Sequence, residues 1–174
     1  MAKRRTKKAA GIIHLSTGPL PERLAVRFPG HGLVFTDASR LRHGGLAVII
    51  YPCANAAPEI VTRSVALDGS NELEMQAAIF GLQQAALRLP GLPFALFSDN
   101  QDAVVRLSRV KAMGAAQDLA LRERFPEINL DAGLKHATPC WVQGHGRCRG
   151  NALADGHARL AAGGEAPPGW PISP

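Results

Sequence analysis

Four acidic residues, Asp37, Glu74, Asp99 and Asp155, occupy positions where a lone carboxylate is costly to bury. Asp37 and Asp99 each end a short apolar run that is typical of a buried strand. A carboxylate in such a place needs a positively charged partner or a bound cation. Four carboxylates together form an oxygen-rich set, which suits Mg²⁺ or Mn²⁺ and does not suit zinc.

Glu74 lies on the apolar face of an expected helix. At about 100° per residue, Ala78, Gly81 and Ala85 fall within roughly 40° of Glu74, whereas polar residues such as Gln83 lie on the opposite side. The sequence therefore predicts that Glu74 points toward the sheet. The small residues beside it allow the helix to approach closely enough for its carboxylate to reach the strand ends.

Each acid also has an ordinary explanation when it is considered alone. Asp37 and Asp99 could be turn residues or helix caps. Asp155, which shares a small apolar stripe with Ala158 and Ala162, could be an acid that the dipole favours near a helix N-terminus. The four acids together favour a shared metal site.

The elements that must position these acids can be read from the hydrophobic pattern. Strands are expected at 33–39, 46–52, 59–67, 94–100 and 141–145, and helical segments at 71–89, 101–110, 114–124 and 151–162. The order βββαβαβα predicts an α/β fold with a mixed five-stranded sheet flanked by helices. The expected domain spans residues 32–163, between a basic, disordered tail (1–31) and a Gly/Pro-rich tail (164–174).

Four motifs in this chain order resemble the type 1 ribonuclease H family: FTDAS, SNELEMQAAIFGL, FSDNQDAV and WVQGHGRCRGNALAD. In the last motif a Gly-His pair is followed by Asn six residues after the His and by Asp four residues later, which is similar to the family's His loop and final helix. The resemblance runs from about Leu33 to Ala162 and implies the family's RNase H-like fold.

The resemblance also implies an activity and a set of roles. The family hydrolyses the RNA strand of RNA–DNA hybrids, leaving a 5′-phosphate and a 3′-hydroxyl. It implies two Mg²⁺ ions, with Mn²⁺ as a possible substitute, held by Asp37, Glu74, Asp99 and Asp155, and a proton-transfer and product-release role for His145. It further implies hybrid contacts from Ser39, Asn71, Gln101 and Asn151.

The chain departs from the family in its basic surface. The family's glycine-rich stretch after the first acid is replaced by SRLRHGG, and the region 105–135 carries scattered basic residues but no tryptophan. Of the net charge of +6, five units come from Lys3, Arg4, Arg5, Lys7 and Lys8. This run is either a solvated tail or an arm that binds phosphates and compensates for the missing contacts.

Composition limits the other possibilities. No apolar run is long enough to span a membrane, and the basic start lacks the apolar core of a secretory signal. Three irregularly spaced cysteines argue against a disulfide framework, so we expect a cytoplasmic, monomeric protein. A zinc site built from His136, Cys140, His145 and Cys148 is disfavoured, because their spacing is irregular and contains no Cys-x-x-Cys pair.

Two other functions stay open on the sequence. The first is a nuclease of the same fold that acts on another nucleic acid. The second is a catalytically silent nucleic-acid-binding domain, although all four acids are present and such a domain could have lost one.

Overall fold

Five strands form one mixed sheet in the computed structural model, which describes residues 14–171 and 173. They are β1 (Gly32–Arg40), β2 (Gly44–Tyr51), β3 (Glu59–Val65), β4 (Phe94–Ser98) and β5 (Ala137–Trp141). The spatial order is β3-β2-β1-β4-β5; β1, β2 and β3 pair antiparallel, whereas β4 is parallel to both β1 and β5. The predicted α/β class and mixed five-stranded sheet are confirmed.

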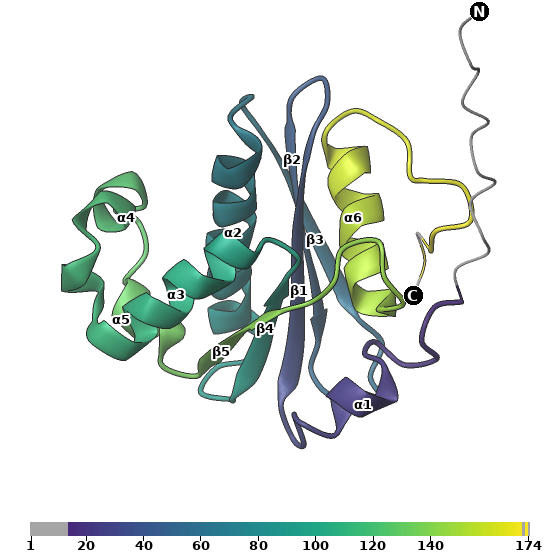
Figure 1. Ribbon diagram of the computed structural model, residues 1–174, viewed down its shortest axis with the longest axis horizontal. Coiled ribbons are helices and arrows are strands. Elements are labelled where there is room, and N and C mark those ends of the chain that lie inside the picture. Colours follow the sequence, from purple (N-terminus) through teal and green to yellow (C-terminus); the bar gives the residue numbers. More distant parts are fainter. Residues whose placement is uncertain (1–13, 172, 174) are drawn as a thin grey trace, which may run out of the picture.

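Helices cover both faces of this sheet (Figure 1). The described chain forms α1 (Glu22–Ala25), α2 (Ser70–Arg88), α3 (Gln101–Met113), the 3-10 turn η1 (Ala115–Gln117), α4 (Leu119–Arg124), α5 (Leu130–Leu134) and α6 (Arg149–Ala161). Helices α2, α3 and α5 enclose one apolar core, and α6 with the segment around α1 encloses the other. None of the helices in the described part of the chain is long and apolar enough to cross a membrane.

The two central strands separate these cores by simple alternation. In β1, Val34 packs toward α2, whereas Leu33 and Phe35 pack toward α6. Every residue of β2 is buried, as expected for a strand that is apolar on both faces. Side chains two residues apart in a strand therefore share a face of the sheet. The same alternation shows on which face Asp37 lies.

The predicted bounds of the fifth strand, 141–145, were wrong. The strand runs over Ala137–Trp141, and Pro139 pairs opposite Leu96. Proline is tolerated here because β5 is an edge strand, but in the sequence it argues against a strand. As a result His145 lies in a turn after the strand, before α6 begins.

The expected tail at 1–31 also differs from the structure over its second half. Leu20 is 4% exposed, and Leu24 and Phe28 pack against the same core. Their spacing of four residues is a helical signal that the sequence analysis passed over. Two backbone hydrogen bonds, Ser16 N to Arg147 O (2.7 Å) and Gly150 N to Pro19 O (3.0 Å), attach this segment to the start of α6. Residues 1–13, with all five basic tail residues, lie outside the described residues.

Candidate functional site

Asp37 and Asp99 lie side by side because β1 and β4 are parallel and in register. Phe35 is paired with Phe97, so the two aspartates follow their paired strand residues by the same two positions. The buried hydroxyl of Thr36 donates a hydrogen bond to the Phe97 carbonyl (3.1 Å) and fixes the two strands at this point. The two carboxylates therefore share one end and one face of the sheet.

Glu74 reaches the same place from the second turn of α2, as the sequence predicts. A Cβ atom on Gly81 would lie 2.5 Å from the Thr36 methyl carbon, so the helix approaches β1 more closely than any other residue there would allow. The backbone amide of Ala38 donates a hydrogen bond to the Glu74 carboxylate. The small residues of this helix face thus bring an acid to the strand end.

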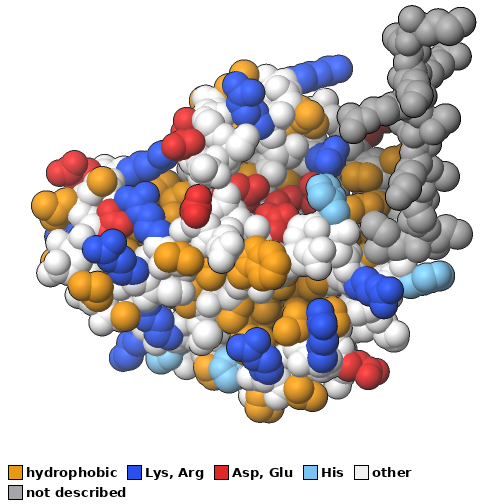
Figure 2. Space-filling model, in the orientation of Figure 1, with side chains coloured by type: hydrophobic (Ala, Val, Ile, Leu, Met, Phe, Trp, Pro, Cys, Tyr) orange, Lys and Arg blue, Asp and Glu red, His pale blue; other side chains and the backbone are white. Residues whose placement is uncertain are grey.

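Asp37, Glu74 and Asp99 together form a carboxylate cluster. One oxygen from each lies within 4.8 Å of the others. Asp37 is 4% exposed, and the other two are partly buried. Figure 2 shows acidic side chains gathered near the centre of one face, with a histidine beside them and basic side chains mostly toward the rim.

The electrostatics of the cluster favour protonation or a bound cation. Burial raises the pKa of Asp37 well above its usual value, and the charges of Glu74, Asp99 and Asp155 raise it further. The pKa of Glu74 is raised to about 8, mainly by burial and then by the charge of Asp99. Burial and the charge of Asp155 also raise the pKa of Asp99, partly offset by His145 and by a hydrogen bond from Asn151. Three neighbouring acids that all resist ionisation are expected where a divalent cation normally compensates their charge.

Asp155 borders the cluster from α6 and is not one of the three residues within 4.8 Å. One of its oxygens accepts a hydrogen bond from Arg159 (3.2 Å) one turn along the helix. The other oxygen is buried and has no hydrogen-bond partner among residues 14–171 and 173. The sequence thus predicts a set of four acids, of which the structure brings three close together and places the fourth beside them.

The donor atoms fit a hard divalent cation. Glu74 Oε2, Asp155 Oδ2 and Asn151 Oδ1 are buried oxygens that lack a hydrogen-bond partner within the described residues. Buried polar atoms are normally paired, so three such oxygens around one cluster need an external partner. Carboxylate and amide oxygens are the ligands that Mg²⁺ and Mn²⁺ prefer.

The other expected site residues lie around this cluster. His145 is exposed in the turn before α6, where its backbone adopts a φ of 52°. Asn71 and Gln101 are exposed at the N-terminal ends of α2 and α3, and Asn71 accepts a hydrogen bond from Asn100 (3.0 Å). Ser39 is half-buried near the end of β1, on the same alternating face as Asp37.

Asn151 is buried, although a residue that contacts the hybrid is expected to be exposed. Its side chain is 3% exposed, in the first turn of α6. Its amide donates a hydrogen bond to the Asp99 carboxylate. The structure therefore places Asn151 beside the carboxylate cluster, under the surface.

The four residues of the disfavoured zinc site do not form a metal-binding group in the described chain. Cys148 is buried and its thiol donates to the Pro19 carbonyl (3.2 Å), while the thiol of Cys140 donates to Thr138 (3.3 Å). Burial raises the pKa of the Cys148 thiol to about 11, so this side chain is a poor thiolate ligand at neutral pH.

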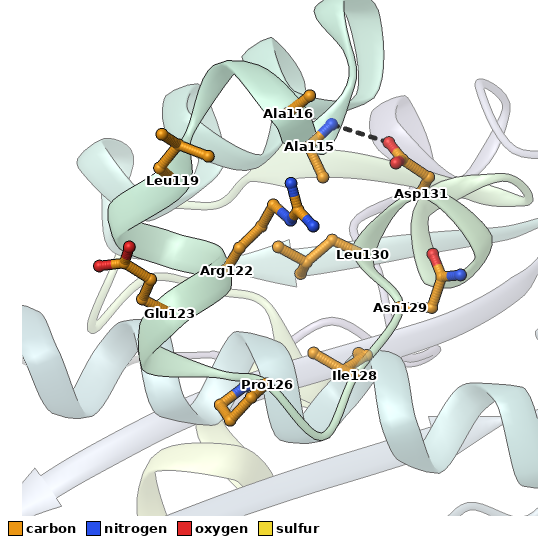
Figure 3. A pocket seen from close by; sticks show the side chains of 10 residues that line it. All are labelled: Ala115, Ala116, Leu119, Arg122, Glu123, Pro126, Ile128, Asn129, Leu130 and Asp131. Carbon is orange, nitrogen blue, oxygen red and sulfur yellow. Dashed lines mark hydrogen bonds between the residues drawn. The ribbon is translucent and has the colours of Figure 1, made fainter.

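Two cavities in the described part of the chain are lined by residues other than the clustered acids. One of about 630 Å³ lies between η1, α4 and α5, where Arg122 extends toward Leu130 and Asp131 accepts a hydrogen bond from the Ala115 amide (Figure 3). Another of about 700 Å³ adjoins His145 and is lined by Arg23 and Arg147 among others. The arginines of this second cavity are the kind of side chain that contacts phosphates.

Solved structures with the same fold are found, although no family model and no curated protein matches the sequence. The protease–reverse transcriptase of prototype foamy virus aligns over 90% of this chain at 17% identity with a TM-score of 0.57, and this chain spans 22% of it. The N-terminal RNase H domain of a Mycobacterium tuberculosis protein aligns over 76% of this chain and 96% of its own, at 16% identity and a TM-score of 0.56.

A third structure, LC11-RNase H1 from a compost metagenome in complex with an RNA/DNA hybrid, aligns over 65% of this chain and 86% of its own. Its identity is 14% and its TM-score is 0.51. At these identities the likeness is one of fold. The chain has the RNase H-like fold, with an acidic cluster just beyond the paired part of the parallel strands β1 and β4.

Proposed function

We propose that this chain is a type 1 ribonuclease H, an endonuclease that hydrolyses the RNA strand of RNA–DNA hybrids. The observation that carries the proposal is the buried cluster of Asp37, Glu74 and Asp99, whose oxygens lie within 4.8 Å of one another on an RNase H-like sheet. The motif order in the sequence and the likeness to RNase H structures support the same substrate.

The proposed site holds two Mg²⁺ ions, for which Mn²⁺ can substitute, through the three clustered acids and Asp155. When bound, such ions make water nucleophilic at neutral pH and stabilise charge on the leaving oxygen. In the net reaction water oxygen bonds to phosphorus and the bond from phosphorus to the 3′-oxygen breaks. A proton reaches that 3′-oxygen, which leaves a 3′-hydroxyl on one product and a 5′-phosphate on the other.

Side chains of the chain itself would then transfer protons, contact the hybrid and hold the metal ligands in place. We assign to His145 the transfer of a proton to or from the reacting oxygens and help in product release; its exposed turn and its electrostatic interaction with Asp99 support this role. Ser39, Asn71 and Gln101 lie at the surface around the cluster, where their polar groups can contact the hybrid and read a 2′-hydroxyl. Asn151 fits better as the residue that holds Asp99 in place.

Divalent-ion titration tests the metal site and separates an enzyme from a silent binding domain. We expect Mg²⁺ or Mn²⁺ to raise the melting temperature by several degrees, since a ligand at 100 times its Kd adds about 2.7 kcal/mol. The Asp37→Asn/Glu74→Gln double variant should lose this response, whereas Glu127→Gln, at an exposed acid away from the cluster, should keep it. A wild-type protein that is indifferent to both ions would favour the silent domain.

The basic tail carries a separate expectation. Deleting residues 1–10 should weaken hybrid binding and reduce the magnitude of the slope of log K against log salt by up to about 4.5, because each of five phosphate contacts contributes about 0.9. The deletion spares Ser16 and Pro19, which attach the described N-terminal segment to the start of α6. Turnover at saturating hybrid should be unchanged.

A matched variant separates charge from chain length. Replacing Lys3, Arg4, Arg5, Lys7 and Lys8 by glutamine in the full chain should reproduce the deletion. Filter binding of the hybrid at several salt concentrations gives the slope for each protein. Equal slopes for the wild-type and the glutamine variant would show that the tail does not bind phosphates. A monomeric state and a cytoplasmic location stay predictions.

A further inference from the structure

The segment after α6 returns to the turn that carries His145. After α6 the amide of Gly163 donates to Leu160 O (3.1 Å), and the positive φ of Gly163 (81°) reverses the chain so that the amide of Gly164 donates to Arg159 O (3.0 Å). Beyond this reversal the chain, yellow in Figure 1, runs back outside α6 toward the helix's N-terminal end. The expected Gly/Pro-rich tail is thus placed next to the candidate site.

A tight turn then directs one side chain of this segment. In Pro167-Pro168-Gly169-Trp170 the amide of Trp170 donates to the Pro167 carbonyl (3.1 Å), and Gly169 has a φ of 78°. Proline at the second position and a positive φ at the third are the requirements of a type II turn. The ring of Pro168 restricts the backbone, Gly169 permits the positive φ, and the hydrogen bond from Trp170 to Pro167 closes the turn, so Trp170 leaves it in a defined direction.

Trp170 contacts the imidazole of His145. The ring centroids are 5.6 Å apart and the ring planes meet at 66°, an edge-to-face arrangement. His145 is exposed, lies between two glycines and takes a left-handed backbone conformation, so its own turn restrains it weakly.

We propose that Trp170 is a positioning residue for His145. The inference rests on the proposed role of His145 in proton transfer. Contact with the indole limits the orientations of the imidazole and favours those in which its ring faces the carboxylate cluster. Among the described residues, Trp170 is not a member of either apolar core, and its ring contact is with His145. The histidine is therefore the side chain through which we expect Trp170 to act.

Steady-state cleavage by four variants tests this coupling. Trp170→Ala should lower kcat about 3- to 10-fold, the range that one aromatic pair supports, with KM unchanged. Trp170→Phe, which keeps an aromatic edge, should recover most of the loss. In a His145→Ala background, Trp170→Ala should not lower kcat further, because the residue through which Trp170 acts is absent. Equal fractional losses in both backgrounds, or a rise in KM alone, would overturn the proposal.

The turn provides a second test with a matched control. Gly169→Ala should lower kcat in the same direction as Trp170→Ala, because alanine disfavours the positive φ there. Gly91→Ala is matched to it: Gly91 has a φ of 72°, and in neither position would an added Cβ meet an atom within 4 Å. Gly91 lies between α2 and β4, so its substitution should leave kcat unchanged. Equal effects of the two substitutions on kcat would contradict the proposal.

An NMR readout separates this inference from the proposed activity. The indole ring current should shift the ring protons of His145, and Trp170→Ala should move those signals toward exposed-histidine values. Unchanged signals would overturn the contact whether or not the protein cuts RNA. If the signals move but the wild-type protein cleaves no hybrid, the contact stands and the proposed function fails.

Discussion

Replacing Asp37 by asparagine is expected to lower the rate of RNA cleavage in an RNA–DNA hybrid by about 10³-fold or more. Asp37 is the most deeply buried of the clustered acids, and its oxygen lies within 4.8 Å of both Glu74 and Asp99. Asparagine has nearly the same shape, so the packing of β1 should persist. What is lost is the negative charge that would hold a divalent ion between the strand ends.

The control for this variant is Asp102→Asn, at an exposed position in the first turn of α3. It removes one carboxylate from the same surface without touching the cluster, and it should cleave at nearly the wild-type rate. Circular dichroism should show both variants folded. Near wild-type cleavage by Asp37→Asn would rule out the carboxylate cluster as the catalytic site.

The second large effect is a pH dependence of stability in the metal-free protein. The pKa of Glu74 rises from 4.5 to about 8 on folding, so the folded state binds this proton more tightly than the unfolded state. Its contribution to the free energy of unfolding is therefore fully present below about pH 4.5. That contribution is lost as the pH rises toward 8, at up to about 1.4 kcal/mol per pH unit. The raised pKa values of Asp37 and Asp99 act in the same direction.

Urea unfolding in chelator between pH 5 and 8.5 measures this dependence. Glu74→Gln should be more stable than the wild-type protein at pH 8 and should show a flatter profile, whereas Glu127→Gln should follow the wild-type curve. Saturating Mg²⁺ should remove most of the wild-type loss, because a bound cation replaces the proton as the partner of the acids. A wild-type stability that increases from pH 5 to 8 in chelator would contradict the raised pKa of Glu74.

The sequence was most informative where one face of an element is buried. Alternation in the runs that end at Asp37 and Asp99 predicts the face on which these acids lie, and the strand register confirms that face. Helical spacing likewise predicts the direction of Glu74, because the only small stripe of that helix must face the sheet. The proximity of Asp37 and Asp99, which are far apart in the sequence, followed from the parallel pairing of their strands that the expected fold requires.

Local signals were weaker where tertiary contacts override them. Pro139 concealed β5, since only its place at the sheet edge makes a proline acceptable there. The N-terminal segment looked like a tail because its packing residues, Leu20, Leu24 and Phe28, are few and lie among Gly, Pro and charged residues, which concealed their four-residue spacing. Trp170 was passed over within a Gly/Pro-rich end, although the Pro-Pro-Gly-Trp sequence is a recognisable turn signal.

The most direct test of the central claim is cleavage of one end-labelled RNA strand paired with DNA, beside matched RNA–RNA and DNA–DNA duplexes, in Mg²⁺ or Mn²⁺. We expect the purified chain to cut only the RNA of the hybrid, to leave 5′-phosphate and 3′-hydroxyl ends, and to lose activity in chelator. Cleavage of DNA, or equal cleavage of both RNA-containing duplexes, would contradict the hybrid substrate and leave only the fold. No cleavage of any duplex with either ion would contradict the enzyme itself.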